Sequence, residues 1–362
     1  MLTQLFYIGL SLVLIHVTVP LLYYIIILTY VKKPWPINPI NVNNEELPAV
    51  SIIVPTYNEE DMIIGKLNNI LEQNYPLDKI QLIISDSSSD NTQARVEEWL
   101  SRHSGVKLVY IKGPRMGKGY ALNKALESAS GSIIITTDAD SLWAKDSLIN
   151  AVKWLINEQV GLVSCVKAPR GGGLTEDAYR RLYNSLRIGE SKIHSSVVFH
   201  GELLAVKGDL LKSIGGFPMD IGADDSYTGV KVASMGLRAI IPEDVACIEY
   251  VPSNGYGRWR VRRAQHLLQS FMKSMKLPKP SSYRPVYYTE AYLHLVNPWL
   301  LPIGAILLLV SGSLLAYALV ALGVVLLAWP PFRAWVIQQF ILIYAMVRNL
   351  WTKELMWEKI SK

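Results

Sequence analysis

The chain has 362 residues, of which half are hydrophobic, and its formal net charge is +6. Its positive mean hydropathy is unusual for a soluble enzyme of this size, and the length suggests two or three structural units. The two cysteines, Cys165 and Cys247, stand far apart and have no partners at metal-binding spacing. This argues against a disulfide framework and favours buried thiols in a reducing compartment.

Residues 1–31 are predicted to form a transmembrane helix. The run is nearly all apolar, is too long for a signal peptide and has no basic residue at its start. The pair Lys32-Lys33 follows it, which places the end of the helix on the cytoplasmic side. Residues 32–48 contain four prolines and several polar residues and are predicted to be a linker.

Residues 49–257 are predicted to form an α/β domain, because short β-rich runs alternate with helical stretches. The predicted strands are 50–54, 82–85, 107–111 and 133–137, and the predicted helices are 62–73, 92–102 and 120–128. The repetition predicts a doubly wound parallel sheet. Ligands bind such sheets at the carboxyl ends of the strands.

Polar clusters follow three of these strands: 55–59, 86–90 and 138–140. Helix capping is the favoured explanation for Asp90, since Asp is common at caps. It explains Asp138 and Asp140 poorly, because two carboxylates at the end of a buried strand repel each other. A divalent cation would relieve that repulsion, and hard oxygen ligands suit Mg²⁺ or Mn²⁺.

The segment 113–119 is basic but lacks the spacing and the Ser or Thr of a Walker loop. The first strand is not followed by the glycine pattern of dinucleotide-binding folds, which argues against a dinucleotide cofactor. Arg115 and Lys118 precede a predicted helix and could contact a diphosphate. A basic loop on a solvated face is the alternative.

Taken in order, these motifs resemble the family 2 glycosyltransferases of GT-A fold, over roughly residues 49–269. The matching segments are 55–59, Asp86, 117–125, 138–140, Gly215-Gly216-Phe217 and Asp224-Asp225. The resemblance implies a Rossmann-like, doubly wound mixed sheet. It extends to membrane-bound members such as polyprenyl- or dolichyl-phosphate glycosyltransferases and polysaccharide synthases.

The resemblance also implies roles for single residues. The nucleotide-sugar donor would be held by Pro55, Tyr57, Glu59, Asp86, Lys118, Asp138 and Ala139. Asp138 and Asp140 would be the metal pair, with Asp140 the expected direct ligand. Asp225 would be the catalytic base, and Asp224 stands where the family has Glu.

Polymer-forming members carry Gln-x-x-Arg-Trp after the base, and this motif is broken here. Arg258-Trp259 survives in one alignment and Arg263 in another, but the Gln is missing in both. The break argues against processive synthesis. Together with Asp224, the residues Arg258, Trp259 and Arg263 are candidates for contacting the acceptor or its phosphate.

Residues 258–290 are predicted to form an amphipathic basic helix and a linker. Between Arg258 and Thr289 there are eight Lys or Arg and no acidic residue. Such residues beside an apolar segment favour lipid headgroups over nucleic acid. Apolar residues recur at helical spacing, at Val261, Ala264, Leu268, Phe271 and Met275. We expect this helix to lie in the membrane surface, and packing on the domain core is the alternative.

Residues 291–331 are predicted to form a transmembrane hairpin that breaks at Ser311-Gly312-Ser313 and ends at Pro330-Pro331. Residues 332–362 are expected to form an interfacial helix and a cytoplasmic tail. A fourth span is the alternative, but it would place the terminal lysines outside.

The sequence therefore predicts an inverting, metal-dependent glycosyltransferase in the cell membrane, multi-pass, with a cytoplasmic catalytic domain. Its donor would be a UDP- or GDP-sugar, its cofactor Mg²⁺ or Mn²⁺, and its acceptor a lipid phosphate or glycolipid. Membrane lipids are expected partners, a homo-oligomer is left open, and nucleic acid is not expected. The alternatives are a processive polysaccharide synthase, an inactive membrane scaffold and a sugar-phosphate nucleotidyltransferase.

Overall fold

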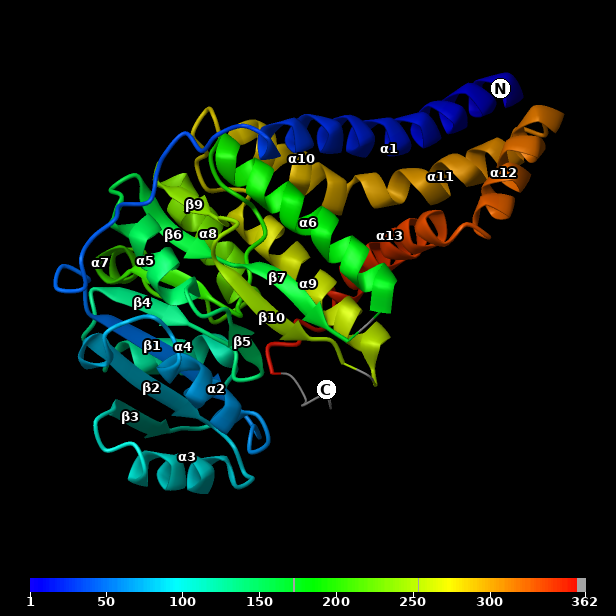
Figure 1. Ribbon diagram of the computed structural model, residues 1–362. Coiled ribbons are helices and arrows are strands. Elements are labelled where there is room, and N and C mark those ends of the chain that lie inside the picture. The colour runs from blue at the N-terminus through cyan, green and yellow to red at the C-terminus, as the bar shows by residue number, and fades with distance from the viewer. Residues whose placement is uncertain (172, 253, 357–362) are drawn as a thin grey trace.

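The computed structural model describes residues 1–356 except Gly172 and Ser253, and omits the side chains of residues 173–175 and 178. A seven-stranded sheet forms the centre of the α/β domain (Figure 1). Its spatial order is β3 (Lys107–Lys112), β2 (Ile80–Asp86), β1 (Val50–Thr56), β4 (Ile133–Thr136), β8 (Leu204–Lys207), β6 (Val160–Ser164) and β9 (Arg238–Ile240). The four predicted strands and three predicted helices are confirmed, with ends that differ by two residues or fewer.

The sheet is mixed, because β8 runs antiparallel to both of its neighbours, β4 and β6. The other pairings are parallel. A second, three-stranded sheet consists of β5 (Ser141–Trp143), β10 (Ala246–Tyr250) and β7 (Val166–Arg170). The α/β class is therefore confirmed, and the mixed sheet replaces the all-parallel one that the strand-helix repetition alone predicts.

Alternating strand residues supply two hydrophobic cores, one on each face of the sheet. In β1, Ile52 and Val54 enter one core and Ile53 enters the other, as expected for a strand that is buried on both faces. The first core is covered by α2 (Ile63–Leu71), α3 (Thr92–Ser101) and α5 (Ser147–Ile156). The second is covered by α4 (Lys118–Leu126), α7 (Gly208–Ser213) and α8 (Asp224–Ser234). A single 3-10 turn, η1 (Leu77–Lys79), precedes β2.

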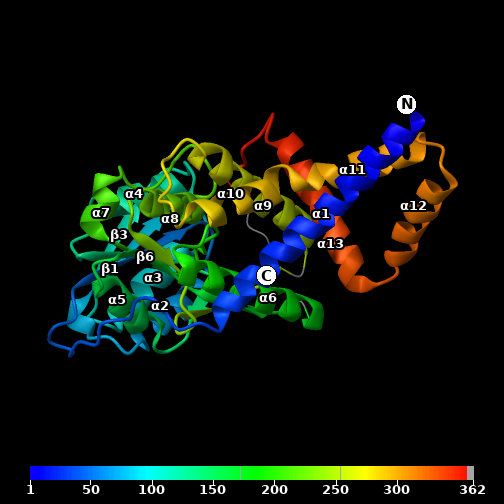
Figure 2. The ribbon, with the colours of Figure 1, turned by 90° about the horizontal axis from the view of Figure 1, so that it is seen from above.

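The remaining helices gather on one side of the sheet domain and extend away from it (Figures 1 and 2). They are α1 (Leu2–Val31), α6 (Gly173–Ile193), α9 (Tyr256–Ser274), α10 (Arg284–Leu295), α11 (Asn297–Val310), α12 (Leu314–Leu326) and α13 (Pro330–Arg348). Helix α1 runs along α11. Gly9 and Gly304 allow this close approach, since a Cβ at Gly9 would lie 2.9 Å from the carbonyl oxygen of Gly304.

A buried ion cluster joins the apolar helices to the catalytic domain. Arg187 of α6 contacts Glu190 at 2.8 Å and Glu290 of α10 at 3.3 Å. The hydroxyl of Tyr23 in α1 donates to Glu190 at 2.9 Å. Three helices that are distant in the sequence are therefore held together by one buried guanidinium and its acceptors. Removing Arg187 alone would leave two buried carboxylates without their partner.

Of the described helices, only α1 is by itself long and apolar enough to cross a membrane. The pair α10–α11, bent by 45°, and the pair α12–α13, bent by 105°, pass the same test when each is counted as one unit. The predicted break near Ser311-Gly312 is present between α11 and α12, where Gly312 has a φ of +68°. The first arm, however, begins earlier than predicted, because α10 leads into α11 at Val296.

Helix α9 corresponds to the predicted amphipathic helix. Ala264 and Leu268 pack against Leu342 and Ala345 of α13. Phe271 is buried in the core beneath α8 and α10. Ala264, Leu268 and Phe271 therefore face protein, as the alternative of packing on the domain expects, whereas Met275 is exposed. The location of this helix in a membrane surface stays a prediction. The period of a hydrophobic pattern locates a buried face without identifying what covers it.

Candidate active site

The carboxyl ends of β1, β2 and β4 meet at one edge of the sheet, where Thr56 is in register with Asp86. A cavity of about 190 Å³ opens at this edge. Its lining includes, from the predicted set, Pro55, Tyr57, Glu59, Lys118, Asp138, Ala139, Asp140, Asp224, Asp225, Trp259 and Arg263. Only two of the predicted residues, Asp86 and Arg258, do not line it. Segments that are more than 200 residues apart in the chain thus converge on one cavity, and those that follow β1 and β4 do so as the strand ends predict.

Lys118 lies at the centre of the acidic residues. Its Nζ is 2.8 Å from Asp138 Oδ1 and 3.5 Å from Asp224 Oδ2. It starts α4 directly after Gly117, whose φ of +93° favours glycine and turns the chain into the cavity. Burial lowers the pKa of Lys118, but Asp138 and Asp224 outweigh burial and raise it above the usual range. The ammonium therefore stays charged and neutralises both acids.

Asp224 and Asp225 occupy the first turn of α8, where the helix dipole favours negative charge. The carboxylate Oδ1 of Asp225 accepts a hydrogen bond of 2.6 Å from the backbone N–H of Ser226. Burial raises the pKa of Asp225 to about 7, and the neighbouring charge of Asp224 adds to the effect. A carboxyl group with this pKa exchanges protons near neutral pH, as a general base requires.

Asp86 lies behind the cavity, with its side chain fully buried. Its Oδ1 accepts from Thr56 at 2.7 Å and its Oδ2 from Tyr110 and Lys112, each at 2.6 Å. Burial opposes the ionisation of Asp86, but these hydrogen bonds, with those from Ser88, lower its pKa overall. Its carboxylate therefore positions the polar side chains around it.

A smaller cavity adjoins the main one beside Pro55 and Tyr57, which the resemblance assigns to the nucleotide-sugar donor. Pro55, Tyr57 and Lys118 line both cavities, and the guanidinium of Arg115 lies 3.9 Å from the centre of the Tyr57 ring. Two further lining residues, Ser87 and Met356, were given no role in the prediction. Ser87 belongs to the polar cluster 86–90 that was expected at this edge of the sheet. No local pattern marks Met356.

A buried network at the wall of the cavity supports Arg263. Glu249 of β10 accepts from Arg263, from Lys167 at 3.1 Å and from Arg180 at 3.0 Å. Lys167 also contacts Glu202, 3.1 Å away, and both Glu202 and Glu249 line the cavity. Desolvation opposes the charge on Glu249, but the three cations hold its pKa well below the usual range. Arg263 is thereby fixed at the wall of the cavity.

Among the residues that the structure describes, no group of three or more His, Cys, Asp or Glu is arranged to hold a metal ion by itself. Asp138 and Asp140 line the same cavity as a pair. Two carboxylates are a sufficient protein contribution for a cation that completes its shell with water and substrate phosphates. The assignment of these two residues to a metal stays a prediction.

Comparison with known proteins identifies the family. The descriptions "Glycosyl transferase family 2" and "Glycosyl transferase family group 2" match residues 51–211 and 133–348. The chain belongs to the family 2 glycosyltransferases, and its fold is of the GT-A type. It is therefore an enzyme that transfers a sugar.

A solved relative is the mannosyltransferase PcManGT from Pyrobaculum calidifontis, in complex with GDP-Man and Mn²⁺. The two chains are 47% identical, with a TM-score of 0.88, over 96% of this chain and 99% of that one. The probable glycosyltransferase YdaM of Bacillus subtilis is 28% identical over 61% of this chain and 55% of its own. A poly-beta-1,6-N-acetyl-D-glucosamine synthase of Staphylococcus epidermidis is 26% identical over 66% of this chain and 60% of its own. This chain thus spans less than two thirds of these curated relatives.

Proposed function

We propose that this chain is an inverting, metal-dependent glycosyltransferase that moves a hexose from a nucleoside diphosphate to a lipid-linked acceptor at the cytoplasmic face of a membrane. The observation that carries the proposal is the convergence of Lys118, Asp138, Asp140 and Asp225 on one cavity. GDP-mannose is the first donor to test, because the mannosyltransferase that shares 47% of its residues with this chain was solved with GDP-Man and Mn²⁺.

The residues at the strand ends fit a divalent cation. The Lys118 ammonium lies 2.8 Å from Asp138, and this ion pair supports a role for the carboxylate in accepting positive charge. Asp138 and Asp140 supply only hard oxygen atoms, which suits Mg²⁺ or Mn²⁺. When bound, the cation would neutralise charge on the departing nucleoside diphosphate. Lys118 would hold the same diphosphate from the opposite side as a charge-assisted donor.

Asp225 is assigned the role of general base. It accepts the proton of the acceptor hydroxyl while that oxygen attacks the anomeric carbon and the bond to the diphosphate breaks. Attack from the side opposite the leaving group inverts the anomeric centre. The neighbouring carboxylate, Asp224, is paired with Lys118 and is therefore not set up as a covalent nucleophile.

The membrane location rests on α1 and on the two bent helix pairs. These helices carry many large apolar side chains that are exposed, such as Leu21, Ile26, Val325 and Phe340. A lipid-linked acceptor brings its reactive group to such an enzyme without leaving the bilayer. The broken Gln-x-x-Arg-Trp pattern favours single transfer over the polymer synthesis named for the Staphylococcus relatives.

The test is a product analysis with the full-length protein in lipid nanodiscs. The protein is incubated with GDP-mannose, or with UDP-N-acetylglucosamine for comparison, and with a lipid extract, while Mn²⁺ is titrated or removed by EDTA. Mass spectrometry should find lipid products heavier by one hexose, formed only with metal. A ladder of repeated additions would establish the polymerase alternative, and full turnover in EDTA would remove the metal from the proposal.

A further inference from the structure

The first helix of the α/β domain carries a lysine on its inward face. The buried residues of α2 are Ile63, Lys66, Leu67 and Ile70, at the spacing of a helix that packs on a hydrophobic core. Lys66 is 0% exposed and is one of the largest side chains that are fully buried. Burying an ammonium costs free energy unless its surroundings compensate for the lost water. A lysine at this position therefore calls for a reason beyond the folding of the sheet.

The ammonium of Lys66 contacts the residues that directly follow the acidic pair. Its Nζ lies 3.4 Å from Ser141 Oγ and 4.2 Å from the centre of the Trp143 ring, whose face attracts a cation. Within the part of the chain that the structure describes, Lys66 forms no ion pair with a carboxylate. Its charge is thus not neutralised by a direct partner, and its hydrogen bond goes to the residue after Asp140.

Ser141 connects Lys66 to the backbone of the acidic pair. The Ser141 hydroxyl donates to the carbonyl oxygen of Asp138 at 2.9 Å. Ser141 is buried, so these contacts do not compete with bulk solvent. A charged donor polarises the hydroxyl and strengthens the bond that the hydroxyl itself donates. Lys66, Ser141 and Asp138 therefore form a chain of hydrogen bonds that ends at one of the two carboxylates assigned to the metal.

The same face of α2 also holds the strand that follows the acidic pair. Asn69, three positions after Lys66, accepts from the backbone N–H of Trp143 at 2.7 Å and donates to the Trp143 carbonyl at 3.0 Å. The Trp143 indole N–H donates to the carbonyl of Glu202 at 2.7 Å. Because Asn69 already anchors the backbone of β5, what Lys66 adds to this contact is a positive charge.

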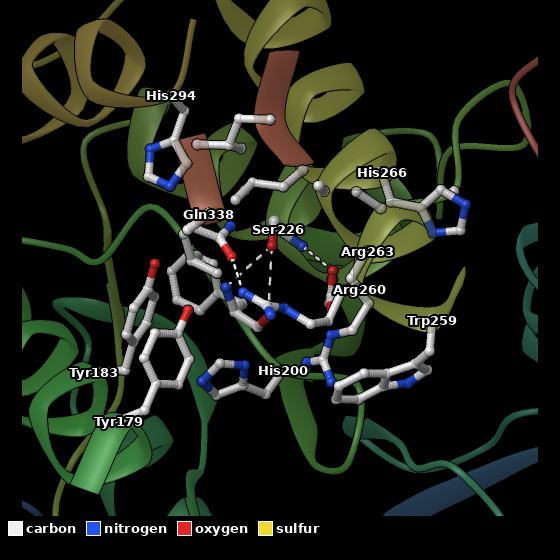
Figure 3. A pocket seen from close by; sticks show the side chains of 18 of the residues that line it. Tyr179, Tyr183, His200, Ser226, Trp259, Arg260, Arg263, His266, His294 and Gln338 are labelled. Atoms are coloured by element: carbon white, nitrogen blue, oxygen red, sulfur yellow. Dashed lines mark hydrogen bonds between the residues drawn. The ribbon is translucent and has the colours of Figure 1, made fainter. Parts of the chain in front are cut away.

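Two lysines flank the acidic pair from different sides. Lys118 lines the main cavity and lies 2.8 Å from Asp138. Lys66 lines neither that cavity nor the cavity of about 210 Å³ that meets it at Asp225, where Figure 3 labels Arg260 and Arg263. A ligand in the main cavity can displace Lys118 from the carboxylate, but it cannot reach Lys66. The charge of Lys66 therefore stays behind the pair whatever the cavity holds.

The charge of the acidic pair acts on Lys66. Burial lowers the pKa of Lys66 to about 8, and the groups that oppose this effect include Cys247, Asp138 and Asp140. The ammonium form still predominates at pH 7. By the same interaction, the ammonium acts on whatever charge the pair holds. Because it attracts the bare carboxylates and repels a divalent cation between them, it reduces the free energy gained when that cation binds.

We propose that Lys66 is a positioning residue that fixes the turn of the acidic pair from the core side and limits the affinity of that pair for a divalent cation. The inference rests on the proposed function, in which Asp138 and Asp140 hold Mg²⁺ or Mn²⁺. A limited affinity serves turnover, because the nucleoside diphosphate and its cation must leave after each transfer. Lys66 touches neither substrate nor metal, and it acts only through Ser141 and through its charge.

The experiment measures Mn²⁺ binding directly. Full-length protein in nanodiscs of neutral lipid receives one equivalent of GDP at pH 7, Mn²⁺ is titrated, and the free ion is followed by electron paramagnetic resonance. Lys66→Met keeps the length of the side chain and removes its charge, and the apolar face of α2 accepts a thioether. This variant should bind Mn²⁺ about tenfold more tightly than wild type, as expected for one buried charge acting on a divalent ion across the turn.

Three further variants separate charge from structure. Lys66→Arg keeps a cation and should retain the wild-type affinity. Ser141→Ala keeps Lys66 but removes the hydroxyl that supports the Asp138 carbonyl, so its affinity for Mn²⁺ should fall. Lys145→Met is the matched control. It removes an exposed lysine just after β5 that lines neither cavity, and it should bind Mn²⁺ as wild type does.

Weaker or unchanged Mn²⁺ binding by Lys66→Met would overturn the inference, and weaker binding with a lower midpoint of thermal unfolding would show that Lys66 is only structural. Equal tightening by Lys66→Arg or by Lys145→Met would overturn it as well, because the effect would then not come from the charge at this position. If wild-type protein binds no Mn²⁺, or if Asp140→Ala binds it as tightly as wild type, the metal assignment of the proposed function fails instead.

Discussion

The rate of transfer should depend on pH through the ionisation of Asp225. Burial, and after it the charge of Asp224, raises the pKa of Asp225 to about 7. The base must be ionised to accept a proton, so the rate should rise with pH and level off above the pKa. A group with this pKa is ionised to about 90% at pH 8 and about 9% at pH 6. The value of kcat/KM for the acceptor should therefore fall about tenfold between pH 8 and pH 6.

The assay measures kcat/KM for the acceptor from pH 5.5 to 8.5 at constant ionic strength, with donor and Mn²⁺ saturating. Calorimetric titration of GDP-mannose at each pH separates donor binding from the chemical step. Asp224→Asn removes a charge that raises the pKa of Asp225, so its midpoint should move to lower pH. Asp225→Asn should retain donor binding and lose at least about a hundredfold in transfer to a hydroxyl.

A profile that stays flat from pH 5.5 to 8 would refute this reasoning, provided that donor binding is also constant. The same conclusion would follow if Asp225→Asn transferred mannose at the wild-type rate. A midpoint that Asp224→Asn leaves unchanged would retain Asp225 as the base but would assign its raised pKa to burial alone.

Three further predictions concern other parts of the chain. Asp140→Ala should abolish metal-dependent donor turnover, measured as GDP release, and normal turnover would remove Asp140 from the metal site. Lys112→Met removes a 2.6 Å contact to the buried Asp86 and should lower the free energy of unfolding, measured by urea titration, by about 1–2 kcal/mol. An unchanged free energy would mean that the remaining hydrogen-bond donors stabilise the Asp86 carboxylate without Lys112. Gly9→Val should separate α1 from α11, because a Cβ at this position would lie 2.9 Å from the carbonyl oxygen of Gly304. The midpoint of thermal unfolding in detergent should therefore fall. An unchanged midpoint would show that the two helices adjust to the larger side chain.

The sequence located the strands and most of the cavity because the required signals are local. The strands are short runs rich in apolar residues, and a polar cluster follows three of them, as Asp138 and Asp140 follow β4. Parallel strands place such clusters at one edge whatever the details of packing. Asp225 was found differently: no strand precedes it directly, and only the resemblance to the family marked it.

Other features depend on contacts between distant segments. Glu249 and Lys167 lie in strands of the second sheet and are paired across it, and neither stands in a recognisable motif. The antiparallel insertion of β8 likewise depends on where the chain returns to the sheet. For α9, the spacing of the apolar residues correctly predicted which face of the helix is buried. That α13 packs against this face could only be learned from the structure.

The segment after α13 has a consequence for how the two substrates influence each other. Gln265 donates to the carbonyl of Thr352 at 3.1 Å and Gln269 to that of Lys353 at 3.0 Å, so α9 holds this segment in place. The segment continues to Met356, which lines the smaller cavity beside Arg115 and Lys118, while Gln338, earlier in α13, lines the cavity of about 210 Å³ that meets the main one at Asp225. One continuous stretch of chain therefore touches both cavities. If occupancy of one space shifts this stretch, thermodynamic reciprocity requires that donor and acceptor alter each other's affinity by the same factor.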